Sequence, residues 1–173
     1  MNKAFTKETE APEEPPEFVD ALPPGMKNYM TPEGAKRLHE ERRHLHDIER
    51  PKLLANKADG PSKKRLREID QRLLFIGKRL RITEVVDPSR QKNHAQVFFG
   101  ASVTYADGAG AEHTVRIVGV DEARLELGEV SWVSPIARAL NGAGPGDIVK
   151  LSSPSGIEEI EILKIDYKNP AST

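Results

Sequence analysis

Few residues in this chain have the types and spacing that enzyme or metal chemistry requires. His39, His44 and His46 lie close together, but no two are three or four residues apart, the spacing that places two ligands on one helix face. The glycine-rich run at 142–146 lacks the Lys-Ser/Thr pair of a phosphate-binding loop. The chain has no cysteine, which excludes thiolate chemistry. The sequence therefore predicts no metal site, no cofactor of its own and no small-molecule substrate.

The groups left for function are cations, concentrated in the middle of the chain. Residues 1–35 carry three Lys against seven acids, residues 36–83 carry fifteen Lys and Arg against seven, and residues 84–173 carry eight against thirteen. The corresponding net charges are −4, +8 and −5. A basic segment between acidic ends is suited to a polyanion or to an acidic channel. The plainer alternative is that Lys and Arg only solvate a helical surface.

Many of these cations lie on a helix with a regular apolar seam. Between residues 62 and 83 the seam positions are spaced 3, 4, 3, 4 and 3 apart, and they are Leu66, Ile69, Leu73, Ile76, Leu80 and Thr83. This spacing is typical of a helix that packs lengthwise on a second helix. We therefore expect one arm of a coiled coil over residues 62–86, capped by Ser62 and followed by Pro88.

The partner arm is expected over residues 31–57. Thr31 and Pro32 supply an N-cap and a proline at the first helical position. Pro51 should kink this arm or end its first half, because it has no backbone N–H and crowds the preceding turn. The seam is weaker here, since Glu41 interrupts the apolar residues Ala35, Leu38, Leu45 and Ile48.

Residues 58–61 contain Asp, Gly and Pro and form the expected turn between the arms. The result is an antiparallel hairpin over residues 26–87 whose arms are roughly 40 Å long.

The segments on either side of the hairpin have different compositions. Residues 1–25 are acidic and proline-rich, which predicts a disordered tail that either solubilises the chain or folds back on the basic arm as a mimic of nucleic acid. Residues 88–96 form a polar linker. Residues 97–168 contain short apolar runs between Gly- and Pro-rich turns. The expected fold class is α+β: a helical hairpin followed by a small, mostly antiparallel β domain with one short helix, which Ser134 and Pro135 begin.

Several segments resemble the bacterial Gre transcript cleavage factors, the GreA/GreB family. They are FGA at 99–101, VRIVG at 115–119 followed by Asp121 and Glu122, SPIARAL at 134–140, and KRLREID at 64–70, which is closest to the GreB branch. The resemblance spans about residues 26–168. It implies a hairpin that enters the secondary channel of RNA polymerase. It also implies a globular domain of FK506-binding-protein-like topology that docks on the rim of that channel.

The resemblance also implies roles for individual residues. The family positions implicated in docking on the polymerase are matched by Asp121, Ser134 and Pro135. Contacts to the emerging RNA end or to the channel wall, without sequence preference, would come from Lys64, Arg65, Arg67 and Arg72. The structural alternatives are a loop with a helix cap for the first set and a solvated helix face for the second.

The hairpin tip departs from the family pattern. Gre factors carry there two acids that help to hold a second magnesium ion at the polymerase catalytic centre, whereas this chain is about a dozen residues shorter and keeps only Asp59. Each arm thereby loses roughly 9 Å. Because magnesium requires well-placed carboxylates, Asp59 is a weak catalytic candidate and otherwise a turn former, and any magnesium would be the polymerase's.

These observations favour a transcription regulator without enzymatic activity of its own that binds core RNA polymerase and alters elongation, pausing or arrest. Further partners would be the nascent RNA 3′ end and DNA. We expect a monomer in the bacterial cytoplasm, since the sequence has neither a long apolar run nor the apolar core of a signal peptide. One alternative is an active GreB-like factor that stimulates cleavage of backtracked RNA. Another is a stand-alone nucleic-acid-binding coiled coil, whose binding would depend steeply on salt.

Overall fold

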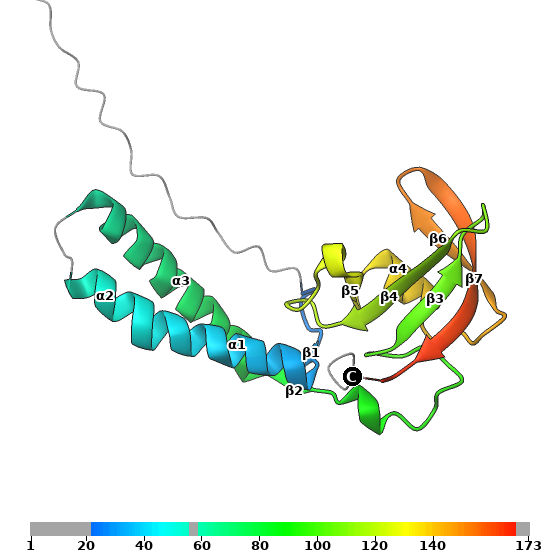
Figure 1. Ribbon diagram of the computed structural model, residues 1–173, viewed down its shortest axis with the longest axis horizontal. Helices are drawn as coiled ribbons and strands as arrows, with labels where there is room; N and C mark the ends of the chain where they lie inside the picture. The colour runs from blue at the N-terminus through cyan, green and yellow to red at the C-terminus, as the bar shows by residue number, and fades with distance from the viewer. Residues whose placement is uncertain (1–21, 56–58, 169–173) are drawn as a thin grey trace, which may run out of the picture.

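A helical hairpin projects from a small curled sheet (Figure 1). The computed structural model describes residues 22–55 and 59–168. The sheet is mostly antiparallel and one short helix packs on it, so the predicted α+β fold class is confirmed. Within the described residues, no helix combines the length and the apolar character that crossing a membrane requires.

The first arm consists of α1 (Pro32–His44), a π-helical turn (Leu45–Glu49) and α2 (Arg50–Ala55). Thr31 is its N-cap, as predicted, because its hydroxyl accepts a hydrogen bond from Gly34 N–H at 3.1 Å. The π turn immediately precedes Pro51, and Arg50 N–H bonds to the carbonyl of Leu45, five residues back. This wider turn relieves the clash that proline imposes on an α-helix, so Pro51 distorts the arm without ending it.

The second arm, α3 (Gly60–Ile82), differs from the prediction at both ends. Its N-cap is Asp59 rather than Ser62, since the Asp59 carboxylate accepts the Ser62 N–H at 2.8 Å. Gly60 and Pro61, predicted to lie in the turn, are therefore helical. The arm ends at Ile82 instead of residue 86, because the β-branched segment that follows forms a strand.

That strand, β2 (Thr83–Val85), pairs in parallel with β1 (Asn28–Met30) at the root of the hairpin. The two-stranded ribbon was not predicted. Residues 22–25, which the sequence places in the disordered tail, are described, and Leu22 is buried. The rest of that predicted tail, residues 56 and 57 of the predicted first arm, and residue 58 of the predicted turn lie outside the described residues.

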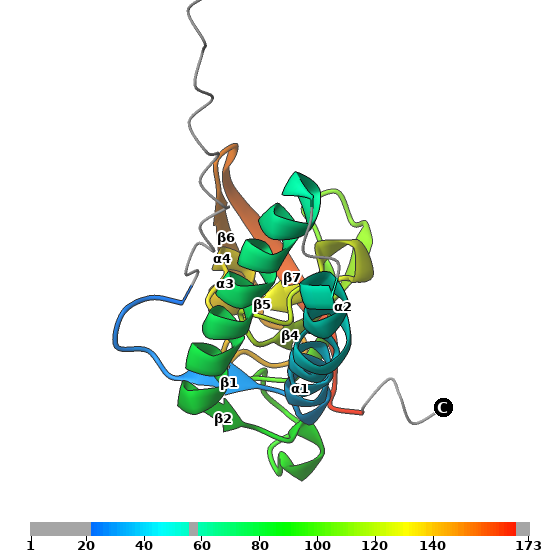
Figure 2. The same cartoon turned by 90° about the vertical axis from the view of Figure 1, so that its left-hand side faces the viewer.

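The two arms lie side by side along a shared apolar seam (Figure 2). Ile48 is the exception, since it was predicted in the seam but is 44% exposed. The π turn inserts about one extra residue per turn and rotates this position outward. The buried residues are Met30, Ala35, Leu38, Leu45, Ile69 and Ile76, with Leu53, Leu73, Phe75 and Leu80 partly buried around them.

The five-stranded sheet has the order β5-β4-β3-β7-β6, in which only β4 and β5 pair in parallel. The strands are β3 (Ser102–Ala106), β4 (Glu112–Val118), β5 (Glu129–Ser131), β6 (Ile148–Ser153) and β7 (Gly156–Asp166). The β domain predicted from residue 97 does not begin with a strand: a turn at residues 98–101, where Gly100 adopts a φ of 86°, precedes β3. Short 3-10 turns occur at Pro88–Arg90 and Leu125–Leu127.

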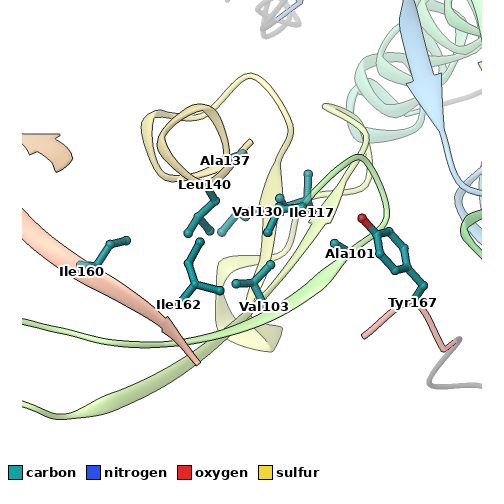
Figure 3. Close-up of a cluster of buried hydrophobic side chains, with 10 residues drawn as sticks. Ala101, Val103, Ile117, Val130, Ala137, Leu140, Ile160, Ile162 and Tyr167 are labelled. Atoms are coloured by element: carbon teal, nitrogen blue, oxygen red, sulfur yellow. The ribbon is translucent and has the colours of Figure 1, made fainter. Parts of the chain in front are cut away.

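The helix α4 (Pro135–Leu140) covers one side of the sheet and completes its core (Figure 3). Ser134 caps it through a hydrogen bond from Ala137 N–H at 3.3 Å, as predicted. Leu140 and Ala137 point from α4 toward the strands, where the buried partners include Val103, Ile117, Val130, Ile160 and Ile162.

The seam predicts a contrast between two residues of α3. Ile76→Ala should lower the free energy of unfolding by about 2–5 kcal/mol, because Ile76 is fully buried and its loss leaves a cavity between the arms. Leu74→Ala is the matched control, since Leu74 is 61% exposed and its loss should cost less than about 1 kcal/mol. Urea denaturation of the three proteins measures both, and equal losses for the two variants would contradict the seam.

Candidate functional site

The hairpin is joined to the sheet by a buried carboxylate at the start of α1. Glu122, whose side chain is 2% exposed, accepts hydrogen bonds from Thr31 N–H at 2.9 Å, from Gly119 N–H at 2.8 Å and from the Thr31 hydroxyl. A negative charge at a helix N-terminus is favourable. Gly34 is required here, because a Cβ at that position would overlap the Glu122 side chain. Glu122 therefore ties the first arm directly to the β domain.

Asp121, predicted to dock on the polymerase, faces the second arm. Its carboxylate accepts Arg79 Nε–H at 3.1 Å and the Asn28 side-chain amide at 3.3 Å. The Arg79 and Asp121 side chains are 3% and 10% exposed, so this ion pair is almost fully buried. The Arg79 guanidinium also lies over the Phe75 ring, 5.0 Å from its centroid. The structure thus brings Asp121 together with the hairpin root, and its docking role stays a prediction.

Ser134 and Pro135 stand at the entrance of α4, beside an apolar pocket of about 350 Å³. Val133 and Ala137, which flank the pair, line that pocket. The Trp132 indole N–H is buried and has no acceptor among the described residues. The other lining residues are Met26, Tyr29, Phe98, Phe99, Ile117, Arg138 and Asn141.

The pocket is built from both parts of the molecule. The Tyr29 ring, on β1, lies 5.2 Å from the Trp132 ring and 5.9 Å from the Phe99 ring, measured between centroids. Tilted aromatic contacts of this kind are favourable. The hairpin root therefore forms one wall of the pocket, and the sheet and α4 form the others.

Two of the four predicted RNA-contacting cations are engaged in ion pairs between the arms. Arg72 binds Glu41 at 2.6 and 2.8 Å, and this hydrogen bonding raises the pKa of the guanidinium. Arg65 binds Glu49 at 3.0 Å and Glu68 at 3.3 Å. Glu41, which interrupts the seam, is therefore the partner of a cation on the other arm.

The other two predicted cations, Lys64 and Arg67, are exposed on α3. Arg67 forms no ion pair with any residue in the described part of the chain. The predicted contacts of all four cations with RNA or with the channel wall stay predictions.

At the tip, Asp59 acts as a helix cap. Hydrogen bonds from the side chain and the backbone N–H of Ser62 lower the pKa of the Asp59 carboxyl, so it is ionised at neutral pH. Over residues 22–55 and 59–168, no group of three or more His, Asp and Glu side chains is arranged to hold a metal ion.

A basic face on α1 and the π-helical turn after it was not predicted from the sequence. His39, Arg42, Arg43 and His46 are exposed and, together with Asp47, line a hollow of about 360 Å³. Their spacing of 3, 1 and 3 residues places them on one side of the helix. The 3-1-3 spacing is present in the sequence only when Arg and His are considered together, because the histidines alone do not have it.

The hairpin, its buried junction and the apolar pocket define an elongated protein with a helical projection and an apolar pocket at the root of that projection. The family model for the transcription elongation factor GreA/GreB C-terminal region matches residues 91–167. A transcription elongation factor GreB of Neisseria meningitidis serogroup A is 44% identical over 154 residues, covering 82% of this chain and 94% of its own. One from Pasteurella multocida is 38% identical, covering 82% and 97%.

A solved structure of the transcription elongation factor GreA/GreB from Nitrosomonas europaea is 20% identical over 82% of this chain and 99% of its own, with a TM-score of 0.39. At the identity and coverage of the Neisseria relative, family membership is established. This chain belongs to the GreA/GreB family of transcription elongation factors.

The buried ion pair generates the second prediction. Arg79→Ala should lower the free energy of unfolding by about 3–5 kcal/mol, because it leaves Asp121 buried without its cation. Arg81→Ala, two residues along the same helix and exposed, should change it by less than about 0.5 kcal/mol.

A double-mutant cycle with Asp121→Ala checks the assignment. If the pair carries the effect, the double variant loses clearly less stability than the sum of the two single variants in urea titrations. Strict additivity would mean that Arg79 acts through packing alone.

Proposed function

We propose that this protein docks on core RNA polymerase through the pocket beside Ser134 and Pro135, and that it directs its hairpin into the secondary channel to regulate elongation. The observation that carries the proposal is the pocket itself. It is apolar, it opens next to the segment that family resemblance implicates in docking, and it is lined by Trp132, whose buried indole N–H has no acceptor among the described residues. An unpaired buried donor is costly, so a rearrangement of the pocket on docking that gives this N–H an acceptor would add affinity.

The chemistry of the pocket specifies what the polymerase must offer. Aromatic walls from Tyr29, Phe99 and Trp132 fit an apolar side chain inserted between them. Arg138 is exposed at the rim and favours a carboxylate on the partner. The proposed partner surface is therefore an apolar residue flanked by an acid and a hydrogen-bond acceptor.

The hairpin supplies the length needed to extend into the secondary channel. The helical stretch from Pro32 to Ala55 spans about 36 Å at 1.5 Å per residue. Its direction relative to the pocket is set by the two buried carboxylates at its root. Lys64 and Arg67, which are exposed on α3, are proposed to contact the channel wall or the RNA 3′ end. A protein that acts in this way would work in the bacterial cytoplasm, as a monomer bound to polymerase.

The composition of the hairpin tip favours regulation of elongation without stimulation of RNA cleavage. A metal ion shared with the polymerase would need more than one carboxylate from the hairpin tip, and Asp59 is held as a cap on Ser62 N–H. The alternative, an active cleavage factor, would have to work with this single acid.

Docking predicts the behaviour of a rim variant. Arg138→Glu should weaken binding to core polymerase at least about tenfold, because it reverses the charge at the pocket edge without removing a buried side chain. Lys150→Glu, an equal charge change on the exposed edge strand β6, is the matched control and should bind like the unaltered protein. Surface-immobilised polymerase with each protein in solution measures the affinities.

A further variant, Trp132→Phe, keeps an aromatic side chain, although a smaller one, and removes the N–H, and should cost about 1–3 kcal/mol of binding if the indole donates to the polymerase. An unaltered protein with no affinity for core polymerase would refute the proposed function.

The tip predicts the outcome of a cleavage experiment. When added to polymerase arrested on backtracked RNA, the protein should release no short 3′ RNA fragments beyond the polymerase's own rate, and Asp59→Asn should leave that rate unchanged. Denaturing gels of 3′-labelled RNA show the fragments. A clear stimulation that Asp59→Asn abolishes would establish the active-factor alternative.

A further inference from the structure

The α1 basic face, formed by His39, Arg42, Arg43 and His46, lies outside the proposed docking pocket and has no assigned partner. We propose that the acidic N-terminal segment of this same chain, residues 1–21, binds this face and competes there with external polyanions. The inference concerns a contact within the chain, so it holds or fails independently of polymerase docking.

The face is positive because its cations are not neutralised locally. Neither Arg42 nor Arg43 forms an ion pair with another residue in the ranges 22–55 and 59–168. The acids nearest in sequence are engaged elsewhere: Glu40 lies 3.9 Å from Lys36, and Glu41 is held by Arg72 on the other arm. Two guanidiniums therefore face solvent side by side.

The histidines and one acid complete the hollow. Asp47 bonds to His46 Nδ1 at 2.7 Å, so its charge is directed to that imidazole. His39 lies one turn before the arginines and offers ring nitrogens to a carboxylate. The face can thus receive several carboxylates in a row, with Arg42 and Arg43 as the fixed charges at its centre.

The N-terminal segment has the complementary charge. Residues 1–21 carry two lysines against six acids, which are Glu8, Glu10, Glu13, Glu14, Glu17 and Asp20. Consecutive acids in this set are one to three residues apart, so the segment carries a closely spaced row of negative charges. On α3, Arg65 and Arg72 are paired with acids, whereas Lys63 and Arg67 are exposed, so that face is the competing receptor that the charge-reversal control tests.

The length of the segment is sufficient. The described chain starts at Leu22, which is buried, and α1 begins at Pro32. Arg42 lies about 15 Å along the helix from that start, whereas twenty-one extended residues span up to about 70 Å. A tether of this kind gives an effective concentration on the order of millimolar, so even weak ion pairs are populated, and salt weakens them.

The test uses the full-length protein with the six segment acids changed to Gln or Asn. In 1H–15N spectra at low salt, the amide signals of residues 39–47 should differ between this neutral-segment variant and the unaltered protein, and the difference should vanish at about 1 M salt. Affinity for a twenty-nucleotide oligothymidine should rise by about three- to tenfold in the variant, because the competitor is lost.

Charge reversal identifies the receptor. Arg42→Glu with Arg43→Glu should make the spectra of residues 39–47 insensitive to neutralising the segment, whereas the control pair Lys63→Glu with Arg67→Glu on α3 should leave the sensitivity intact. Identical spectra for the unaltered and neutral-segment proteins at low salt would overturn the proposal. So would shifts that fall on α3 and respond to the control pair.

Discussion

Two buried carboxylates, Asp121 and Glu122, hold the hairpin against the β domain. Burying a carboxylate is costly unless donors replace its water. Here Glu122 accepts hydrogen bonds from the backbone N–H and the hydroxyl of Thr31 and from Gly119 N–H. Asp121 accepts hydrogen bonds from Arg79 Nε–H and from the Asn28 side-chain amide. Because adjacent residues of one loop bind both arms, the hairpin cannot change its orientation relative to the β domain without breaking at least one of these contacts.

This junction also couples the two surfaces that the proposed function uses. Tyr29 lies on β1, between the buried Asn28 and Met30, and at the same time forms a wall of the apolar pocket. A partner that inserts into the pocket therefore touches the hairpin root directly. In the proposed complex, the same few residues would set both the position of the polymerase and the direction of the hairpin.

The excess of Lys and Arg in the hairpin is not all available to a partner. Arg65 and Arg72 join the arms through Glu49 and Glu41, so part of the excess of cations stabilises the hairpin instead of facing a partner. Arg42 and Arg43 do face solvent, on the opposite arm from the cations singled out by family resemblance. The cationic surface that the hairpin presents to solvent is thus decided by pairing across the arms as well as by the number of Lys and Arg.

The sequence by itself determined the hairpin, the α+β class, the family and the cap of α4. The hairpin rests on the 3-4 spacing from Leu66 to Leu80 and on Thr31 before Pro32, and the cap of α4 rests on Ser134 before Pro135. The fold class rests on the short apolar runs after the hairpin, and the family rests on segments such as SPIARAL at 134–140. Only the tertiary structure decided the β1–β2 ribbon, the Arg79–Asp121 pair, the outward rotation of Ile48 and the pocket around Trp132. Asp121 illustrates the reason. Its partner Arg79 is 42 residues away, and the energy of a buried ion pair depends on how chain segments are brought together and shielded from water, which no local pattern encodes.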